Sequence, residues 1–247
     1  METYLNKFSS RFFSYNPTMG LTLIFLFGLP RFALVLHSYV IRSYGLVMFV
    51  FFVMWFTPFL LLNKGGRKEI GLKAPVRFWT LPVSFLAGCI ICFLLFLTFS
   101  LLYDKTTENA FVYIAGNNAI NSMSPDSRNI YFLIAVIPSM LFSPIGEEFL
   151  YRGVIHGCFV SRFGERGASV IDSLAFSLTH VAHFGILYIS GVWVFTFIPT
   201  LIWIVSMFIA CQVFFQCKQL SSSVWGAVAA HAGFNFMMMF IVFYILL

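Results

Sequence analysis

Long apolar runs separated by short polar segments dominate the chain. The runs are continuous instead of alternating residue by residue, which favours helices, and about twenty apolar residues suffice to cross a bilayer. Residues Ile186–Ser190 form either a loop or a short eighth element. The pattern predicts an all-α, polytopic transmembrane helical bundle of about seven spans, or eight with that element, in one domain over residues 1–247. The expected spans are Met19–His37, Tyr44–Leu62, Phe78–Tyr103, Ile130–Val160, Ala168–His183, a run within Gly191–Phe215 kinked at Pro199, and Ser222–Leu247.

Composition supports a membrane protein. Hydrophobic residues make up 60% of the chain and charged residues only 10%, whereas an ordinary soluble domain has about 25% charged residues. So few charges could not cover the surface of a soluble protein of 247 residues. The same figures exclude an intrinsically disordered chain, a collagen-like repeat and a disulfide-rich scaffold.

The excess of basic residues predicts an orientation. A net charge of +6 would suggest nucleic acid in a soluble protein, but here it indicates basic loops on the cytosolic side, so we expect no nucleic-acid partner. With seven spans, ten Lys and Arg residues lie on the side of the N-terminus and three on the other side. We therefore expect a cytosolic N-terminus. The basic loop Asn63–Val76 is first a topology determinant, and binding of anionic lipid head groups is its second interpretation.

Ionisable side chains inside the spans are concentrated in three of them. A central charge in a membrane helix costs roughly 2.5–3.5 kcal/mol, so such residues need partners. Counted at 1.5 Å per residue, Glu147, His180 and His231 lie roughly 20, 18 and 14 Å from the cytosolic ends of their spans. This common depth predicts one interior site. The polar residues of these three spans are Glu147, Glu148, Arg152 and His156 in the fourth span, Asp172, His180 and His183 in the fifth, and His231 and Asn235 in the last.

These residue types suit hydrolysis of an amide bond. A carboxylate and an imidazole can activate water, either directly or through a bound metal. A second imidazole and a carboxamide can stabilise the negative charge that develops on a carbonyl oxygen. Glu147, His180 and His231 could bind Zn²⁺ or another divalent metal, and a mechanism without metal is equally open. Glu148 and Arg152 are four residues apart and are expected to form a supporting ion pair.

Three short motifs resemble those of one protein family. Glu147-Glu148-Phe-Leu-Tyr-Arg152 matches E-E-x-x-x-R, Phe176-Ser-Leu-Thr-His180 matches F-x-x-x-H, and His231-Ala-Gly-Phe-Asn235 matches H-x-x-x-N. In this order they resemble the signatures of the CPBP family, which comprises CAAX prenyl endopeptidases and Abi-type bacterial membrane proteins.

The resemblance implies an all-helical intramembrane endopeptidase. Glu147 would be the carboxylate that activates water, with His180 as its partner, while His231 and Asn235 would line the oxyanion site. Glu148 and Arg152 would support them. The substrate would be a peptide or a membrane-associated protein, such as a peptide precursor or a bacteriocin-like peptide. Membrane lipids are expected to contact the spans, and the oligomeric state is unknown.

The sequence leaves other functional interpretations open. The chain could be a non-catalytic membrane partner, a regulator or a bacteriocin-immunity protein with the same fold, and a transporter or a haem-binding bundle is a third class. Arg31, beside Pro30, is expected to snorkel or to line a break in the first span. His156 and His183 are expected at the membrane interface, and Asp172 either orients a histidine or faces a watery entrance.

Overall fold

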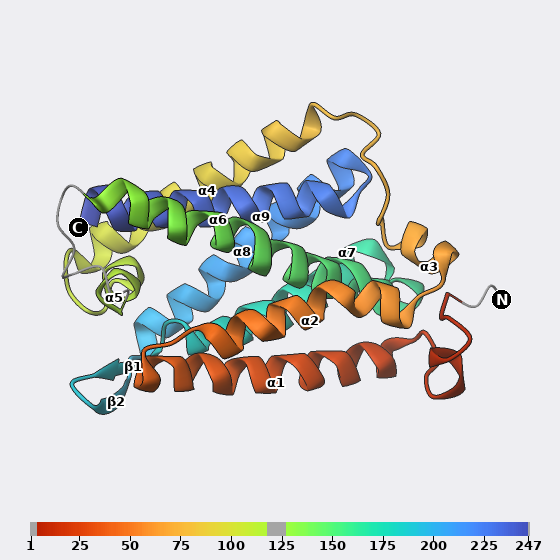
Figure 1. Ribbon diagram of the computed structural model, residues 1–247, viewed down its shortest axis with the longest axis horizontal. Helices are drawn as coiled ribbons and strands as arrows, with labels where there is room; N and C mark the ends of the chain where they lie inside the picture. Colours follow the sequence, from red (N-terminus) through yellow and green to blue (C-terminus); the bar gives the residue numbers. More distant parts are fainter. Residues whose placement is uncertain (1–3, 118–126, 247) are drawn as a thin grey trace.

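The computed structural model describes residues 4–117 and 127–246. Figure 1 shows a helical bundle whose long helices follow its long axis, which confirms the predicted all-α class. Residues 118–126 of the predicted loop Asp104–Asn129 lie outside the described residues. The long helices are α1 (Pro17–Ile41), α2 (Gly45–Leu61), α4 (Thr80–Tyr103), α6 (Arg128–Glu148), α7 (His156–Thr179), α8 (Phe197–Ser221) and α9 (Val224–Ile241).

Short elements lie between the long helices or extend them. The helices α3 (Lys64–Glu69) and α5 (Ala110–Asn117) connect spans. Two π-helical segments, η4 (Phe149–Ile155) and η6 (Val242–Leu246), follow α6 and α9 directly. The remaining pieces are the 3₁₀ turns η1 (Ser9–Arg11) and η5 (His180–Ala182) and the strands β1 (Ile186–Ile189) and β2 (Val192–Phe195).

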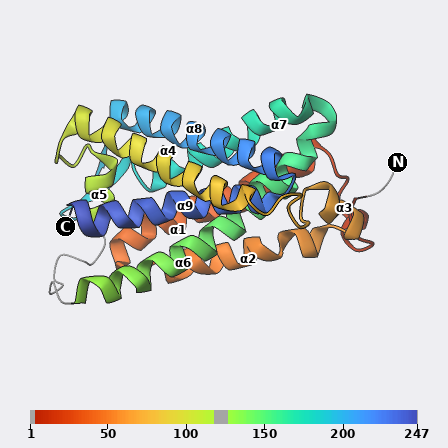
Figure 2. The same cartoon turned by 90° about the horizontal axis from the view of Figure 1, so that it is seen from above.

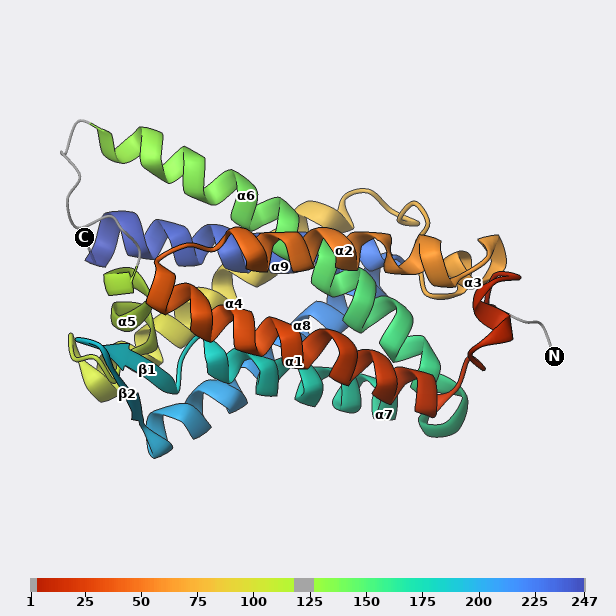
Figure 3. The same cartoon turned by 60° about the horizontal axis from the view of Figure 1, so that its bottom comes forward.

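One long helical stretch makes two passes. Within the described residues, five stretches are long and apolar enough to span a membrane, and the one over Arg128–Ala182 has 55 residues. Gly164 breaks it, with φ 67° and ψ 173° inside α7, a conformation open essentially to glycine alone. Figure 3 shows the chain reversing direction within α7. Dividing this stretch at Gly164 and adding the 17-residue α2 gives the seven predicted spans.

The two ends of the bundle differ in character. Figures 1 and 2 show the N-terminus and α3 at one end, and the C-terminus and α5 at the other. An odd number of passes produces this arrangement. The basic segment around α3 lies at the end of the N-terminus, as the charge count predicts, while the orientation of the bundle in a membrane stays a prediction.

The sixth span was expected within Gly191–Phe215, and α8 begins inside that run at Phe197 but continues six residues beyond it, to Ser221. Ile186–Ser190 forms a short element, as one of its two interpretations allowed, but this element is the strand β1 with the residue that follows it. Ser190 and Gly191 both have positive φ and join β1 to β2 as a two-residue hairpin turn, a geometry that matches the twist of paired strands. Pro199 does not kink α8, because it lies in the first helical turn, where proline replaces no hydrogen bond.

The helix α9 is the most buried of the candidate spans. In its most apolar window 56% of the residues are buried, against 33% for α1 and for α4. It packs against α4, α6 and α8, and Figure 2 shows α9 crossing beside α4 and above α1. Large hydrophobic side chains such as Leu86, Leu101 and Ile134 are exposed on the outer helices, as expected of a surface that lipid covers.

Two glycines bring α4 and α9 into backbone contact. A Cβ on Gly88 would collide with the carbonyl oxygen of Ala230, and a Cβ on Gly233 would collide with that of Phe85. Cys89 Sγ also lies 3.2 Å from the Gly233 carbonyl oxygen, to which it donates. Small residues that permit such close approach drive helix association in membranes. Through this contact α4 fixes the position of α9, which carries His231 and Asn235.

Replacing Gly88 by alanine is expected to destabilise the bundle. The added methyl group has no space and must separate α4 from α9, and overpacking of this kind costs about 1–3 kcal/mol. Thermal unfolding of the purified protein in detergent should show a lower midpoint for Gly88→Ala. Gly116→Ala is the matched control, because a Cβ on Gly116 meets nothing within 4 Å. Equal midpoints for the two variants would contradict the packing described.

Candidate active site

A buried ion pair joins α1 to the end of α6. Arg31 Nη2 lies 2.7 Å from Glu147 Oε1, and the side chains are 1% and 0% exposed. The other carboxylate oxygen of Glu147 accepts a hydrogen bond from Ser143 Oγ at 2.7 Å. Arg31 therefore does not snorkel to the interface as the sequence suggested. Its charge offsets that of Glu147 in the apolar interior, where neither could be carried alone.

The same guanidinium holds two histidines. Arg31 Nη2 lies 3.1 Å from His180 Nε2 and 3.3 Å from His183 Nε2, and Nη1 donates to Thr179 Oγ1 at 2.7 Å. His180 Nδ1 lies 2.8 Å from the Phe176 carbonyl oxygen. Because a carbonyl only accepts, Nδ1 carries the proton and Nε2 accepts from Arg31. His180 is thus a neutral imidazole that orients the arginine.

A second group of contacts surrounds Glu148. Its Oε1 lies 2.8 Å from His231 Nδ1, and its Oε2 lies 3.2 Å from Arg152 Nε. The predicted pair of Glu148 and Arg152 is present. The other ring nitrogen of His231, Nε2, faces Glu147 Oε2 at 3.7 Å. His231 therefore stands between the two adjacent glutamates and connects both groups of contacts.

Aromatic rings hold the polar side chains in place. Phe176 stacks on His180 with ring centroids 4.0 Å apart, and the Arg152 guanidinium lies 4.5 Å from the centroid of its ring. Phe214 stacks on His231 at 4.9 Å. Cation–π contacts of this kind strengthen when they are desolvated. Phe176, the first residue of its motif, thus separates the group around Arg31 from the group around Arg152.

The chain changes helical type directly after the two glutamates. Glu148 ends α6, and the next seven residues form the π-helical segment η4, which includes Arg152. Every residue of η4 is buried. π-Helical turns are rare and occur frequently at functional sites, because they alter the direction of side chains within a continuing helix.

The buried charges continue toward the end of the bundle near Gly164. Arg152 Nε lies 3.8 Å from Asp172 Oδ1, and Asp172 Oδ2 lies 2.7 Å from His156 Nδ1. His156 Nε2 lies 3.0 Å from Glu165 Oε2, whose side chain is 56% exposed. His156 is thus buried within the protein and paired with an exposed carboxylate, while its depth in a membrane stays a prediction. Asp172 therefore contacts and orients a histidine, which is the first of the two interpretations given for Asp172, and its buried side chain does not face a watery entrance.

Asn235 lies apart from the closest contacts. Its Nδ2 donates to the Ser139 carbonyl oxygen at 2.8 Å, two turns before Glu147 on α6. One N–H of this amide is therefore used by the helix, and the other is left for a further acceptor. The structure brings Glu147, Glu148, Arg152, His180 and His231 into one cluster, with Asn235 at its margin on the α6 side.

The sequence did not predict that Arg31 contacts Glu147, and it placed His183 at the membrane interface and not beside His180 and Arg31. The signal for Arg31 was its position: an arginine within an apolar span that contains no acidic partner of its own must find one elsewhere. His183 lies three residues after His180, and its Nδ1 is 3.1 Å from Tyr44 Oη. That tyrosine follows α1, so the turn between α1 and α2 supports the same histidine that Arg31 contacts.

The arrangement of Glu147, His180 and His231 does not suit a metal site. A guanidinium stands where Glu147 Oε1 and His180 Nε2 converge, so the place between them already carries a positive charge. Residues 4–117 and 127–246 also contain no group of three His, Cys, Asp or Glu side chains arranged to bind a metal ion. Two of the three residues, Glu147 and His180, thus contact an arginine instead.

Removing the Arg31 side chain is expected to destabilise the fold strongly. Arg31→Met leaves the Glu147 carboxylate buried without its 2.7 Å partner, and breaking a buried pair in this way costs about 3–5 kcal/mol. Adding Glu147→Gln should recover part of that loss, because no uncompensated charge remains. Thermal unfolding in detergent of wild type, both single variants and the double variant measures the coupling. Arg166→Met, which removes an exposed arginine, is the control. If the losses of stability in the two single variants simply added in the double variant, the ion pair of Arg31 and Glu147 would be contradicted.

Comparison with known protein families finds a match over part of the chain. Residues 129–237 match the family described as Type II CAAX prenyl endopeptidase Rce1-like. This region runs from α6 into α9 and contains Glu147, His180, His231 and Asn235. No curated protein and no solved structure matches the chain significantly. The match over residues 129–237 supports an assignment to the CPBP family of CAAX protease-type endopeptidases, and together with the apolar helices that could span a membrane it points to a multi-pass integral membrane protein.

Proposed function

We propose that this protein is an intramembrane endopeptidase in which Glu147 activates water to hydrolyse a peptide bond. The observation that carries the proposal is the position of Glu147, which is fully buried with a guanidinium on one oxygen and an imidazole facing the other. A carboxylate held in a site from which water is largely excluded is a strong candidate for a general base.

We propose that the attacking water lies between Glu147 and His231. Glu147 Oε2 and His231 Nε2 are 3.7 Å apart, too far for a direct hydrogen bond and suited to a bridging water. Since His231 Nδ1 donates to Glu148, Nε2 is free to accept a hydrogen bond from that water. Glu147 takes the water's other proton as the oxygen attacks the substrate carbonyl, and passes that proton to the leaving amine as the carbon–nitrogen bond breaks. The proton that remains on the attacking oxygen goes to His231 only after this bond has broken, which leaves a carboxylate product.

Two groups are available for the oxyanion. Asn235 retains one N–H after donating to Ser139, and Arg31 supplies a positive charge next to Glu147. Donors placed where charge develops lower the barrier most when water is excluded. His180 accepts from Arg31 and so acts as a positioning residue. The resemblance implies that His180 assists Glu147 and that His231 lines the oxyanion site. These contacts favour a different division of roles, in which His231 contacts the water beside Glu147 and His180 positions Arg31.

The proposed mechanism uses no metal. The positive charge between Glu147 and His180 is that of Arg31, and a divalent cation there would meet a like charge at close range. The protein would then rely on Glu147 and His231 for proton transfer and on Arg31 for charge stabilisation.

The substrate proposed is a peptide precursor or a membrane-associated protein. The matched family is described by its action on CAAX prenyl substrates, and we extend to this chain only the cleavage of a peptide bond at the depth of the bilayer. We propose a bacterial inner membrane with the N-terminus in the cytosol, because the basic segment around α3 lies at that end of the bundle.

Glu147→Gln is expected to abolish proteolysis without preventing insertion. The amide keeps the shape of the side chain but cannot accept a proton, and loss of a general base lowers the rate by at least about 10²-fold. Comparing the peptides of cells that express wild type or Glu147→Gln should reveal precursors that accumulate only in the variant. His180→Ala should behave in the same way, because it releases Arg31.

Glu108→Gln is the matched control, because Glu108 is exposed in the segment after α4. It should cleave like wild type. Full cleavage by Glu147→Gln would end the enzyme proposal. If Glu147→Gln instead supported the same cellular phenotype as wild type without any change in peptides, the protein would act as a non-catalytic partner or immunity protein.

Chelation is expected to leave cleavage unchanged. Incubation of the purified protein with EDTA or 1,10-phenanthroline, followed by assay on a precursor identified as above, measures this directly. Elemental analysis of the same sample should show less than one equivalent of zinc. Loss of activity on chelation that zinc restores would replace the metal-free mechanism with a metal-dependent one.

A further inference from the structure

A groove on the outer surface runs between α4 and α8, away from the candidate active site. Its volume is about 550 Å³, within the range of sites that hold small molecules. The groove begins near Leu220, at the end of the bundle where α8 meets α9, and extends to Ile209. The other lining residues are Val83 and Ala87 on α4 and Gln212, Val213, Gln216 and Cys217 on α8. In a membrane protein such an apolar groove faces lipid.

One polar side chain in the groove has no protein partner. Gln212 turns its amide inward, where it hydrogen bonds with Ser169 and Ser173. Gln216 is exposed, and within the described part of the chain its amide forms no hydrogen bond. It lies five residues before the end of α8, which is roughly 8 Å along the helix. An amide at this depth on a lipid-facing surface needs an acceptor or donor from the lipid.

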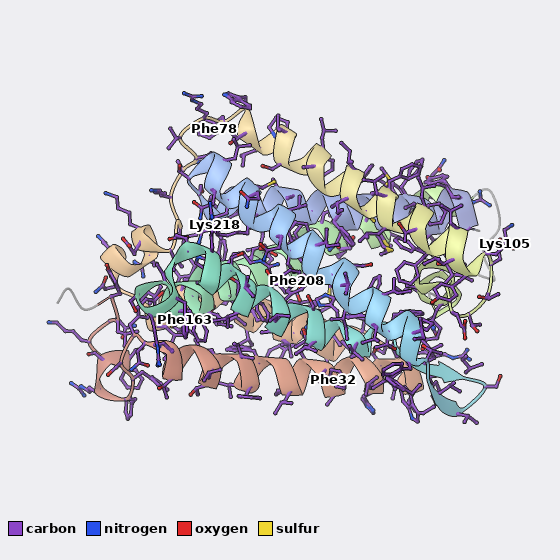
Figure 4. All side chains as sticks on the ribbon, turned by 180° about the vertical axis from the view of Figure 1, so that it is seen from behind. Phe32, Phe78, Lys105, Phe163, Phe208 and Lys218 are labelled. Atoms are coloured by element: carbon purple, nitrogen blue, oxygen red, sulfur yellow. The ribbon has the colours of Figure 1, made fainter. Side chains whose placement is uncertain are left out.

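Basic residues lie at the open end of the groove. The Val76 backbone N–H donates to the Ser221 carbonyl oxygen at 3.1 Å, so the segment before α4 is fixed beside Leu220. Arg77, the next residue, is exposed, and its carbonyl oxygen accepts from Thr80 at the start of α4. Lys73 is also exposed in this segment. Figure 4 shows Phe78 and Lys218 at this end of the bundle and Lys105 at the other.

We propose that this groove binds one anionic phospholipid, with its phosphate on Arg77 and an acyl chain between α4 and α8. From the end of the bundle inward, the groove presents Leu220, then the Gln216 amide, then the apolar side chains of Val213 and Ile209, and Arg77 follows Val76, whose backbone is bonded to Ser221 next to Leu220. A phospholipid presents its phosphate, its ester carbonyls and its acyl chain in the same order. Charge near a membrane surface adds about 1 kcal/mol per basic residue, which converts to a preference of about fivefold for an anionic head group.

This site is independent of the proposed proteolysis. Neither Arg77, Gln216 nor Ala87 belongs to the cluster around Glu147. Occupation of the groove would hold α4 against α8, and α4 in turn packs against α9 through Gly88 and Gly233. The lipid would therefore stabilise the arrangement that carries His231, without taking part in the reaction.

Native mass spectrometry of the purified full chain in detergent tests the proposal. The probe is an equimolar mixture of phosphatidylglycerol and phosphatidylcholine with the same acyl chains. Wild type should retain one phosphatidylglycerol in preference to phosphatidylcholine. Arg77→Gln should lower that preference about fivefold, whereas Lys105→Gln, at the opposite end, should leave it unchanged. Gln216→Leu should weaken retention of both lipids.

Filling the groove provides the second arm. Ala87→Phe places a ring in the groove from its outer side and should abolish retention of either lipid. Leu86→Phe, the neighbouring exposed position that does not line the groove, is the matched control and should bind like wild type. Equal retention of phosphatidylglycerol by wild type, Arg77→Gln and Ala87→Phe would overturn the proposal. Equal retention of both lipids by wild type would overturn the assignment of the phosphate to Arg77.

Discussion

The structure depends on pairing buried charges across helices that are distant in the sequence. Glu147, Glu148 and Asp172 are all completely buried, and two arginines, Arg31 and Arg152, lie against them. Each charge alone would cost several kcal/mol in an apolar interior. The five side chains come from α1, α6, η4 and α7, so these elements must assemble together for any of the charges to be compensated. This requirement selects one arrangement of helices that are otherwise uniformly apolar.

The pairing also joins the part of the chain that the family model matches to a helix that lies outside that match. The family match covers residues 129–237 and includes both glutamates and both motif histidines. Arg31 lies outside it, on α1. The N-terminal helices therefore do more than enlarge the bundle, because one of them supplies the cation that contacts Glu147 and His180. Tyr44, after α1, contacts His183 in the same region. The site as the structure has it is a property of the whole chain.

Much of this could be predicted from the sequence, and the reasons for the rest are physical. Glu148 and Arg152 follow from local helical spacing, and the common depth of Glu147, His180 and His231 follows from the rise per residue. Arg31 could not be paired by such rules, because its partner is more than a hundred residues away and lateral contacts between spans leave no periodic signal. The hairpin was missed because Val192–Phe195 is as apolar as a span, and only Ser190 and Gly191 mark the turn.

The two histidines of the motifs lie in opposite electrostatic surroundings, and this difference limits what each can do. His231 has a carboxylate at each ring nitrogen, whereas His180 has a carbonyl at one and a guanidinium at the other. His231 therefore faces a carboxylate on two sides. A proton added to His180 Nε2 would point at Arg31 and meet a like charge. In the proposed mechanism, His231 is therefore the imidazole that receives a proton, and His180 is the one that keeps the arginine in place.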